Sequence, residues 1–151
     1  MALVYLSLGT NLGNKERNLN DALMAIRAVV SVIRQSNFYA SKPWGFESNN
    51  DFRNAVVLID TDLSPFEVLA KTQEIERTLG RETKTTNNYS DRVIDIDILL
   101  FENLIIDQPT LKIPHPLLAE RDFVLIPLAE IAPNLEHPIL RKNITELLKI
   151  I

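Results

Sequence analysis

The sequence predicts an α+β fold, a ferredoxin-like βαββαβ sheet with helices on one face and an irregular C-terminal extension. The first observation behind this prediction is the order of strand and helix patterns, which runs β-α-β-β-α-β between residues 3 and 101. The second is a pair of amphipathic helix patterns, which can cover one face of such a sheet. The third is the tail, because six of the eight prolines lie after residue 108.

The chain opens with a predicted strand and a predicted helix. Residues 3–8 form a short apolar run that ends at Gly9, which is typical of a buried strand. A turn follows, and Asn14 is a suitable N-cap for a helix. Apolar residues then recur at spacings of three and four, which indicates an amphipathic helix: Leu19, Ala22, Leu23, Ile26, Val30 and Ile33.

Two further strands are predicted before the second helix. Residues 34–41 favour extended backbone because they include adjacent aromatic residues. A polar loop over residues 43–50 separates them from the next run, which indicates a third strand at residues 52–60.

The second helix has the clearest start in the sequence. Ser64 caps it, Pro65 suits the first helical position, and Glu67 completes a capping box. Its apolar stripe is formed by Val68, Leu69, Ile75 and Leu79, and Gly80 suits the helix stop.

The remaining segments complete the predicted order. Residues 81–92 are almost wholly polar and predict a long loop, a feature that is often functional in a compact domain. Residues 93–101 predict the fourth strand. The tail predicts turns and short helices, and a capping box at Asn143 and Glu146 indicates the last helix.

Composition sets limits on the domain count and on the kind of site. A chain of 151 residues with 46% hydrophobic and 24% charged residues is typical of one soluble domain, so we expect residues 1–151 to form a single unit. The absence of cysteine excludes disulfides and thiolate sites. With only His115 and His137 available, a multi-histidine zinc site is not expected.

Charge and hydropathy restrict partners and location. A net charge of −4 disfavours a duplex nucleic-acid binder, which needs a basic face, although it leaves room for a locally basic nucleotide pocket. The N-terminus lacks the pattern of a signal peptide, and no apolar run is long enough to span a membrane. We therefore expect a cytoplasmic monomer without nucleic-acid or membrane partners.

The sharpest local motif is the pair Asp95 and Asp97. Side chains alternate along a strand, so both carboxylates share one face, with Cα atoms roughly 6.6 Å apart. The neighbouring apolar residues are expected to face the helix-covered core: Ile94, Ile96, Ile98 and Leu100. Magnesium commonly joins one or two carboxylates to substrate phosphates, so the pair suits a metal-polyphosphate site. The alternative is a solvated sheet face that pairs with basic residues.

Cationic or titratable residues flank this motif on both sides. They are Arg81, Lys84 and Arg92 before it, and Lys112, His115 and Arg121 after it. Arginine forks match phosphate oxygens, so the set suits a triphosphate, while ordinary surface charge is the alternative for each member. Prolines on both sides of His115 fix its backbone, and the alternative for this residue is a structural role.

Two other groups of residues are candidates for binding. Gln73 and Glu76 lie three apart on one helix face, which is either a site wall or a solvated face. Between residues 41 and 54, an aromatic and an amide alternate onto one strand face at Phe52 and Asn54. This combination suits a flat heterocycle with donor and acceptor edges, and a hydrophobic loop anchor is the alternative, notably for Phe46.

The common nucleotide and hydrolase motifs do not occur. The segment from Gly9 to Lys15 has the wrong spacing for a P-loop and lacks Ser or Thr after the lysine. Neither a G-x-S-x-G elbow nor a G-x-G-x-x-G fingerprint is found. Any ATP site therefore uses a different construction.

Over nearly its whole length the chain resembles the 6-hydroxymethyl-7,8-dihydropterin pyrophosphokinase family of the folate pathway. The most specific motif is the run Arg-x-x-Asp-x-Asp-Ile-Leu from Arg92 to Leu99, followed by Pro-His at 114 and 115. The other landmarks are residues 5–13, 38–39, 51–54, 73–76, 80–81 and 121–123.

The resemblance implies ATP and 6-hydroxymethyl-7,8-dihydropterin as substrates, with two Mg²⁺ ions held by Asp95 and Asp97. It implies that the catalytic residues are Arg81 and Arg92, as phosphate contacts, together with the metal-holding Asp95 and Asp97. The implied ATP site comprises these two arginines with Gln73, Glu76, Lys84, Lys112, His115 and Arg121. The implied pterin site comprises Ser41, Lys42, Trp44, Phe52, Asn54, Tyr89 and Phe123, with Phe52 and Phe123 sandwiching the ring.

The chain departs from the family pattern in two places. Residues 88–91 read Asn-Tyr-Ser-Asp where the family often has Arg-Trp-Gly-Pro, so Tyr89 stands in for the tryptophan as a lid. Lys42 and Trp44 replace smaller or aliphatic residues. Two other classes remain as alternatives: a metal-dependent phosphohydrolase and a non-catalytic ferredoxin-like ligand-binding domain.

Overall fold

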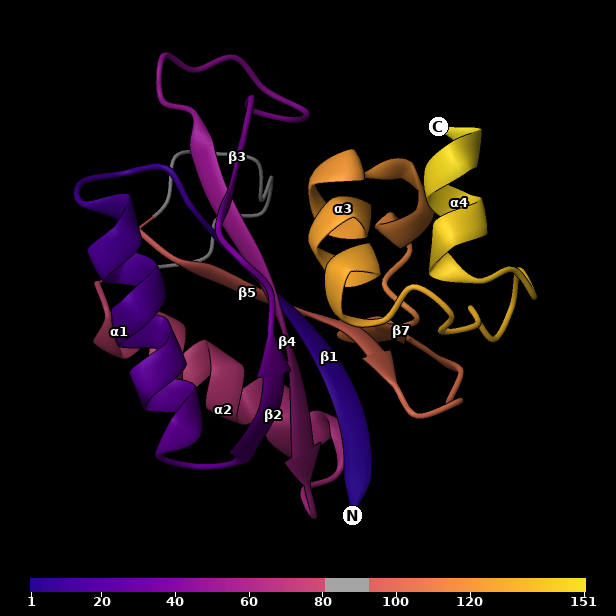
Figure 1. Ribbon diagram of the computed structural model, residues 1–151. Helices are drawn as coiled ribbons and strands as arrows, with labels where there is room; N and C mark the ends of the chain where they lie inside the picture. The colour runs from indigo at the N-terminus through magenta and orange to yellow at the C-terminus, as the bar shows by residue number, and fades with distance from the viewer. Residues whose placement is uncertain (81–92) are drawn as a thin grey trace.

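The computed structural model describes residues 1–80 and 93–151, and it has a mixed α/β architecture (Figure 1). The strands are β1 Ala2–Thr10, β2 Ser31–Gln35, β3 Tyr39–Ser41, β4 Phe52–Thr61, β5 Asp95–Phe101, β6 Ile106–Gln108 and β7 Leu111–Ile113. The helices are α1 Lys15–Arg27, α2 Pro65–Thr78, a 3₁₀ turn Leu118–Glu120, α3 Asp122–Ile131 and α4 Ile144–Ile150. In this part of the chain every helix is too short or too polar to cross a membrane.

The main sheet has the strand order β2-β4-β1-β5, with β3 also paired to β4. Each of these pairings is antiparallel. Helices α1 and α2 lie on one side of the sheet, and α3 and α4 lie on the other (Figure 1). The two outer layers leave part of the second face uncovered, and the cavity described below lies there.

Two apolar cores are built on the two faces of the sheet. The first joins β1, β4 and β5 to α1 and α2 through residues such as Leu6, Leu23 and Ile96. The second joins the same strands to α3 and α4 through residues such as Leu58 and Leu125. Burial on both faces explains why β4 is a nearly continuous apolar run.

Local sequence signals set most element ends. Ser64 and Glu67 form the predicted capping box of α2, and Asn143 and Glu146 form that of α4. Asn14 caps α1 by accepting the backbone N–H of Arg17. Strand β1 continues through Gly9 and Thr10, because both residues still pair with β4.

The boundary between the first helix and the second strand was predicted wrongly. Helix α1 ends at Arg27, and the segment that includes Ile33 belongs to β2. β-Branched residues at positions 29–33 favour extended backbone, and pairing with β4 stabilises it. The predicted strand at residues 34–41 is instead two strands, β2 and β3, separated at residues 36–38.

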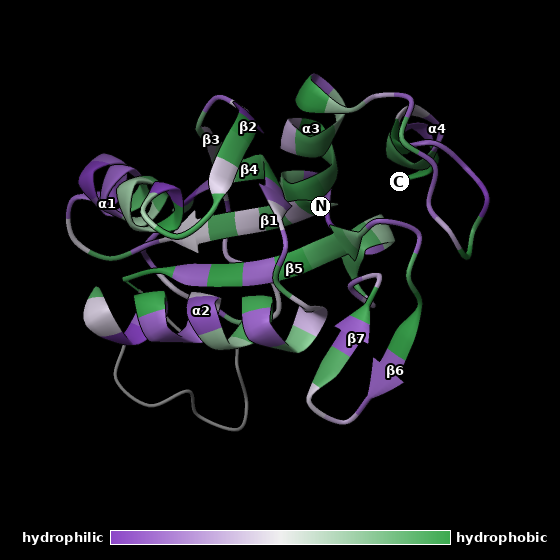
Figure 2. Ribbon diagram, turned by 90° about the horizontal axis from the view of Figure 1, so that it is seen from below, coloured by the Kyte–Doolittle hydropathy of each residue, from purple (hydrophilic) through white to green (hydrophobic). Residues whose placement is uncertain are grey.

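The prediction of which β5 side chains face the helix-covered core is correct at the start of the strand and wrong at its end. Asp95 and Asp97 face away from α2, as expected, but Leu100 packs in the second core rather than the first. A register shift opposite Tyr5 and Leu6 leaves Leu99 as an extra residue. Such a bulge reverses the alternation, so Phe101 takes the inner place. Figure 2 shows β5 alternating at its start and hydrophobic at its end.

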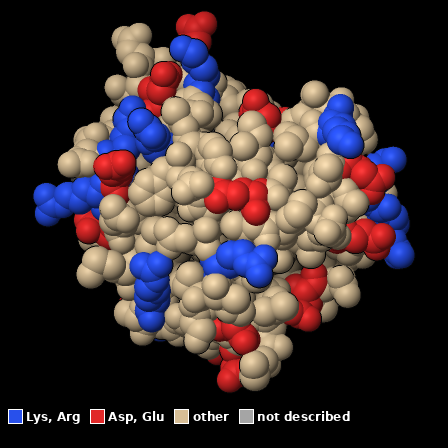
Figure 3. Space-filling model, in the orientation of Figure 1, with Lys and Arg blue, Asp and Glu red and all other residues tan. Residues whose placement is uncertain are grey.

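The tail is more regular than predicted. Residues 106–113 form the two-stranded sheet of β6 and β7, and α3 has 10 residues. Figure 3 shows basic and acidic side chains interspersed over one face of the molecule, in keeping with a net charge of −4.

Candidate active site

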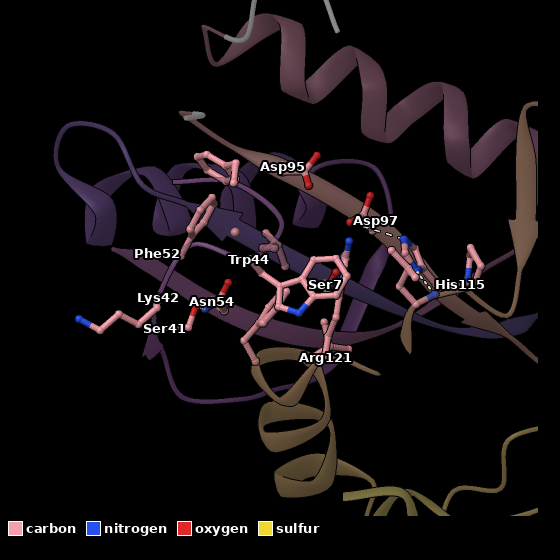
Figure 4. A pocket seen from close by; sticks show the side chains of 17 residues that line it. Ser7, Ser41, Lys42, Trp44, Phe52, Asn54, Asp95, Asp97, His115 and Arg121 are labelled. Carbon is pink, nitrogen blue, oxygen red and sulfur yellow. Dashed lines mark hydrogen bonds and ion pairs between the residues drawn. The ribbon is translucent and has the colours of Figure 1, made fainter. Parts of the chain in front are cut away.

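A cavity of about 350 Å³ lies on the sheet face away from α1 and α2 (Figure 4). Strands β1, β4 and β5 form its floor, and α3 and the segment between β3 and β4 form its walls. The lining residues are Ser7, Leu8, Gly9, Ser41, Lys42, Trp44, Phe46, Phe52, Asn54, Asp95, Asp97, His115, Pro116, Leu117, Arg121, Phe123 and Val124.

The carboxylate pair occupies one end of the cavity. Asp95 and Asp97 are half-buried and lie side by side on β5 (Figure 4). Across the ladder, Asp95 is paired with Gly9 and Asp97 with Ser7. Small partners leave space above the strand, so the acids can reach a ligand. Carboxylate oxygens are the donors that magnesium prefers, and the donor set therefore fits this ion.

His115 borders the same end. Its Nε2 lies 3.9 Å from Oδ2 of Asp97. Its Nδ1 accepts a hydrogen bond from the backbone N–H of Leu117 at 3.1 Å. A nitrogen that accepts carries no proton, so in the neutral ring the proton sits on Nε2 and faces the carboxylate. The backbone N–H of His115 also donates to the carbonyl of Leu99 at 2.9 Å, which ties the residue to β5.

Asn54 presents a fixed amide at the other end. Its Nδ2 donates to Oγ of Ser41 at 2.7 Å and to the carbonyl of Tyr39 at 3.3 Å. Because a carbonyl only accepts, the second contact assigns the nitrogen to this side of the amide. Asn54 is 5% exposed, and these two hydrogen bonds to β3 fix the orientation of its side chain. Its oxygen is therefore the atom offered to a ligand.

Aromatic rings form the walls between the two ends. Trp44 and Phe123 have ring centroids 6.3 Å apart, and Phe46 packs edge-on against Phe52 at 6.1 Å. The guanidinium of Arg121 lies 4.6 Å from the centroid of the Trp44 ring and 5.5 Å from that of Phe123. This arrangement joins a flat apolar slot to a buried positive charge.

The structure brings together ten of the residues that the sequence proposed for the site. These are Ser41, Lys42, Trp44, Phe52, Asn54, Asp95, Asp97, His115, Arg121 and Phe123. The side chain of Lys42 is exposed and points away from the other labelled residues (Figure 4). Arg81, Lys84, Tyr89 and Arg92 lie outside the described residues.

Three predicted residues lie outside the cavity lining. Gln73 is half-buried on α2, and Lys112 forms an ion pair with Asp107 across the β6–β7 hairpin. That ion pair lowers the pKa of Asp107. Glu76 is 3% exposed, and its carboxylate accepts the backbone N–H of Ile96 at 2.8 Å. It therefore supports the strand between the two aspartates.

Sequence reasoning missed the floor residues of β1. Ser7 and Gly9 have no distinctive chemistry, and both lay in segments assigned to a buried strand and a turn. The period-two alternation of β1 would have placed them on the open face, opposite the apolar residues Leu6 and Leu8. Phe46, considered as a loop anchor, also lines the cavity.

Comparison with known proteins gives the family. A model of the 7,8-dihydro-6-hydroxymethylpterin-pyrophosphokinase (HPPK) family matches residues 5–133. The 2-amino-4-hydroxy-6-hydroxymethyldihydropteridine pyrophosphokinase of Porphyromonas gingivalis is 48% identical over 141 residues, covering 91% of this chain and 95% of that protein. The enzyme of the same name from Aquifex aeolicus is 41% identical over 146 residues, covering 97% and 90%.

Solved structures agree on the fold. The crystal structure of wild-type HPPK-DHPS from Plasmodium falciparum superposes with a TM-score of 0.82 at 18% identity, covering 99% of this chain. This chain spans 44% of that longer protein. The family match, the two relatives and the fold are in agreement, and the chain belongs to the 7,8-dihydro-6-hydroxymethylpterin-pyrophosphokinase family.

Proposed function

We infer that this chain is an ATP-dependent pyrophosphokinase of folate biosynthesis. It transfers pyrophosphate from ATP to the hydroxymethyl group of 6-hydroxymethyl-7,8-dihydropterin and releases AMP. Family membership over residues 5–133 supports this function. The observation that carries it is the cavity itself, which joins a carboxylate pair to a slot with aromatic walls and a fixed amide.

We propose that the pterin occupies the aromatic end. Phe52, Phe123 and Trp44 offer flat apolar surface to the ring, and Oδ1 of Asn54 accepts an N–H from its polar edge. Ser41 orients the Asn54 amide through the 2.7 Å hydrogen bond. Tyr89 and Lys42 are assigned to the same substrate from the family pattern.

We propose that Asp95 and Asp97 hold Mg²⁺, with two ions as the family pattern implies. When bound, the metal neutralises phosphate charge and orients the polyphosphate. The chain's own contribution is the placement of two oxygen donors on one strand face, with Ser7 and Gly9 leaving room above the floor. His115 offers Nε2–H beside Asp97 and so suits a phosphate oxygen.

The other residues proposed for ATP binding differ in what supports them. Arg121 supplies a buried positive charge at the cavity wall. Gln73 and Lys112 are assigned to ATP, as are Arg81, Lys84 and Arg92, with Arg81 and Arg92 also proposed as catalytic phosphate contacts. We propose that Glu76 acts indirectly, by fixing β5.

The reaction is an in-line displacement. The hydroxymethyl oxygen attacks the β-phosphorus of ATP, the bond from that phosphorus to the α–β bridging oxygen breaks, and AMP leaves. The hydroxyl proton passes to an oxygen acceptor, for which the two aspartates and the phosphates are candidates. Catalysis rests on positioning and charge neutralisation, because this chemistry needs little else from the protein.

The strand order β2-β4-β1-β5, with α1 and α2 on one face, supports the finer description of the fold as ferredoxin-like. A monomer as the working unit stays a proposal from the sequence.

The test is a nucleotide-product assay with ATP, Mg²⁺ and the pterin. We expect AMP, and only when the pterin is present. ADP, or hydrolysis that does not depend on the pterin, would overturn the proposal in favour of a kinase or phosphohydrolase. Absence of turnover by folded, metal-saturated protein would favour a binding domain.

A further inference from the structure

Gly9 lies in the middle of the cavity floor, and its backbone does not require glycine. It belongs to β1 and pairs with both neighbouring strands. The glycines with positive φ are Gly13, Gly45 and Gly80, so Gly9 has a conformation that other residues adopt. Glycine inside a strand weakens it and often marks the close approach of a ligand. Its presence here is therefore explained by space rather than by backbone geometry.

The space above Gly9 is limited by two residues of the site. A Cβ at this position would lie 3.3 Å from Oδ1 of Asn54 and 3.7 Å from Cδ1 of Phe52. The Asn54 amide cannot easily turn away, because its nitrogen is hydrogen-bonded to Ser41 and to the carbonyl of Tyr39. One added methyl group would therefore fill the floor at this point.

Gly9 also lies midway between the two ends of the cavity. In the sheet register, Asn54 pairs with Gly9 on one side and Asp95 pairs with Gly9 on the other. Two strand spacings separate Asn54 from Asp95, which is roughly 10 Å. A two-ring heterocycle with a one-carbon arm can bridge that distance. A ligand held by Asn54 and reacting beside Asp95 must therefore pass over Gly9.

We propose that Gly9 is a specificity-determining residue that leaves room for the hydroxymethyl-bearing end of the pterin beside the two aspartates proposed to hold Mg²⁺. This inference rests on the proposed function. The bare Cα lets the arm lie low over the strand, where it reaches the phosphate, while the ring stays between the aromatic walls. A side chain at this position would lift or displace the arm.

The experiment compares two ligands in wild type and Gly9→Ala. Affinities of 6-hydroxymethylpterin and of pterin without a 6-substituent are measured by calorimetry, with Mg²⁺ and a non-hydrolysable ATP analogue present. We expect Gly9→Ala to lower the affinity for 6-hydroxymethylpterin by roughly 10-fold or more, since one carbon in a pocket commonly has such an effect. The affinity for the unsubstituted pterin should fall much less, and the affinity for the ATP analogue should not change.

Asn54→Ser is the matched control. It removes a contact to the ring edge that both ligands share, so it should weaken both by similar factors. Equal weakening of both ligands by Gly9→Ala, or no weakening of either, would overturn the inference. The wild-type product assay tests the pyrophosphokinase function separately, so failure of one does not imply failure of the other.

A second variant covers a folding defect in Gly9→Ala, which thermal unfolding would reveal. Gly9→Ala combined with Asn54→Ser shortens the side chain that the new methyl group would press against. In this double variant the preference for the hydroxymethyl ligand should still be lost relative to Asn54→Ser alone. If the preference is retained, Gly9 does not determine specificity.

Discussion

At the scale of single residues, Asp97 is a partly exposed carboxylate that lines the cavity. It stands across the ladder from Ser7 and 3.9 Å from Nε2 of His115, with its side chain 24% exposed. A carboxylate in this position contributes charge to the cavity and little packing to the core. Function and stability should therefore separate when it is changed.

We predict that Asp97→Asn lowers the rate of AMP formation by about 100-fold or more, the scale seen when one group that stabilises developing charge is removed. The thermal unfolding midpoint should stay close to that of wild type, because no buried apolar contact is lost. Steady-state assays and thermal unfolding measure the two effects. Asp62→Asn, at an exposed carboxylate that pairs with the N-terminus, is the control. Wild-type turnover in Asp97→Asn would contradict the metal site.

Glu76 has the opposite character, because it is buried and bonded to backbone. We predict that Glu76→Ala destabilises the protein by about 1–3 kcal/mol, since the N–H of Ile96 loses its buried acceptor. Glu76→Gln keeps an acceptor oxygen and should cost less. Urea denaturation gives the midpoints, with Glu74→Ala on the exposed side of the same helix as the control. Equal midpoints for Glu74→Ala and Glu76→Ala would refute this role.

The sequence identified those site residues whose chemistry is visible in their side chains. Alternation placed Asp95 and Asp97 on one face of their strand and Phe52 and Asn54 on one face of theirs, and all four line the cavity. Alternation also places Gly9 on the open face of β1, but it gives no reason to choose a residue that contributes only unfilled space. The register between β1 and its neighbours shows that this space lies between Asn54 and Asp95.

At the scale of elements, α3 is held against the strands by polar contacts. The carboxylate of Glu130 accepts the backbone N–H of Asn37 at 3.0 Å, the Asn37 amide at 3.1 Å and the hydroxyl of Tyr39. The last contact raises the pKa of Tyr39. Arg34 of β2 donates to the carbonyl of Ile131 at 2.7 Å. These contacts fix the wall that carries Phe123 relative to the strand that carries Ser41.

We predict that Glu130→Ala loosens this wall and weakens pterin binding by several-fold, because an exposed network of this kind contributes about 1 kcal/mol. ATP-analogue affinity should fall less, because Arg121 at the start of α3 is its one proposed contact on this wall, while the two aspartates lie on β5. Calorimetry with each ligand separates the two effects. Glu120→Ala, in the 3₁₀ turn before α3, is the control. Parallel losses for pterin and nucleotide would indicate general unfolding instead.

Element types were easier to predict than element limits. The capping boxes of α2 and α4 are short-range signals and were read correctly. The limit between α1 and β2 was not, because apolar spacing continued through a segment whose pairing with β4 decides its structure. The bulge at Leu99 likewise depends on the packing of β5 against both cores, which no local pattern records.

At the scale of the whole molecule, the pH dependence of the free energy of unfolding should depend on His137. It is 6% exposed, and its Nδ1 accepts the backbone N–H groups of Ile139 and Leu140 at 3.2 and 3.1 Å. Burial lowers its pKa from the ordinary value of 6.5. Between the two values the unfolded chain binds more protons than the folded chain, so the free energy of unfolding falls as pH drops below about 6.5.

We therefore predict that the urea midpoint of the wild type decreases between pH 7.5 and 5.5, and that His137→Gln removes this decrease. Glu67 and Asp107, whose pKa values are lowered from 4.5 and 3.8, act only in more acidic solution. Denaturation series at fixed ionic strength test the prediction. A slope that persists in His137→Gln would assign the effect to another group.

The hydrogen bond between Glu76 and the backbone N–H of Ile96 also affects aggregation. Strand β5 lies at the edge of the sheet, and exposed edges invite pairing with strands of other chains, the first step of many aggregates. Here one outward N–H is already taken by a buried carboxylate, and two acidic side chains flank it. The arrangement that keeps the aspartates in place thus also makes this edge a poor template for self-association.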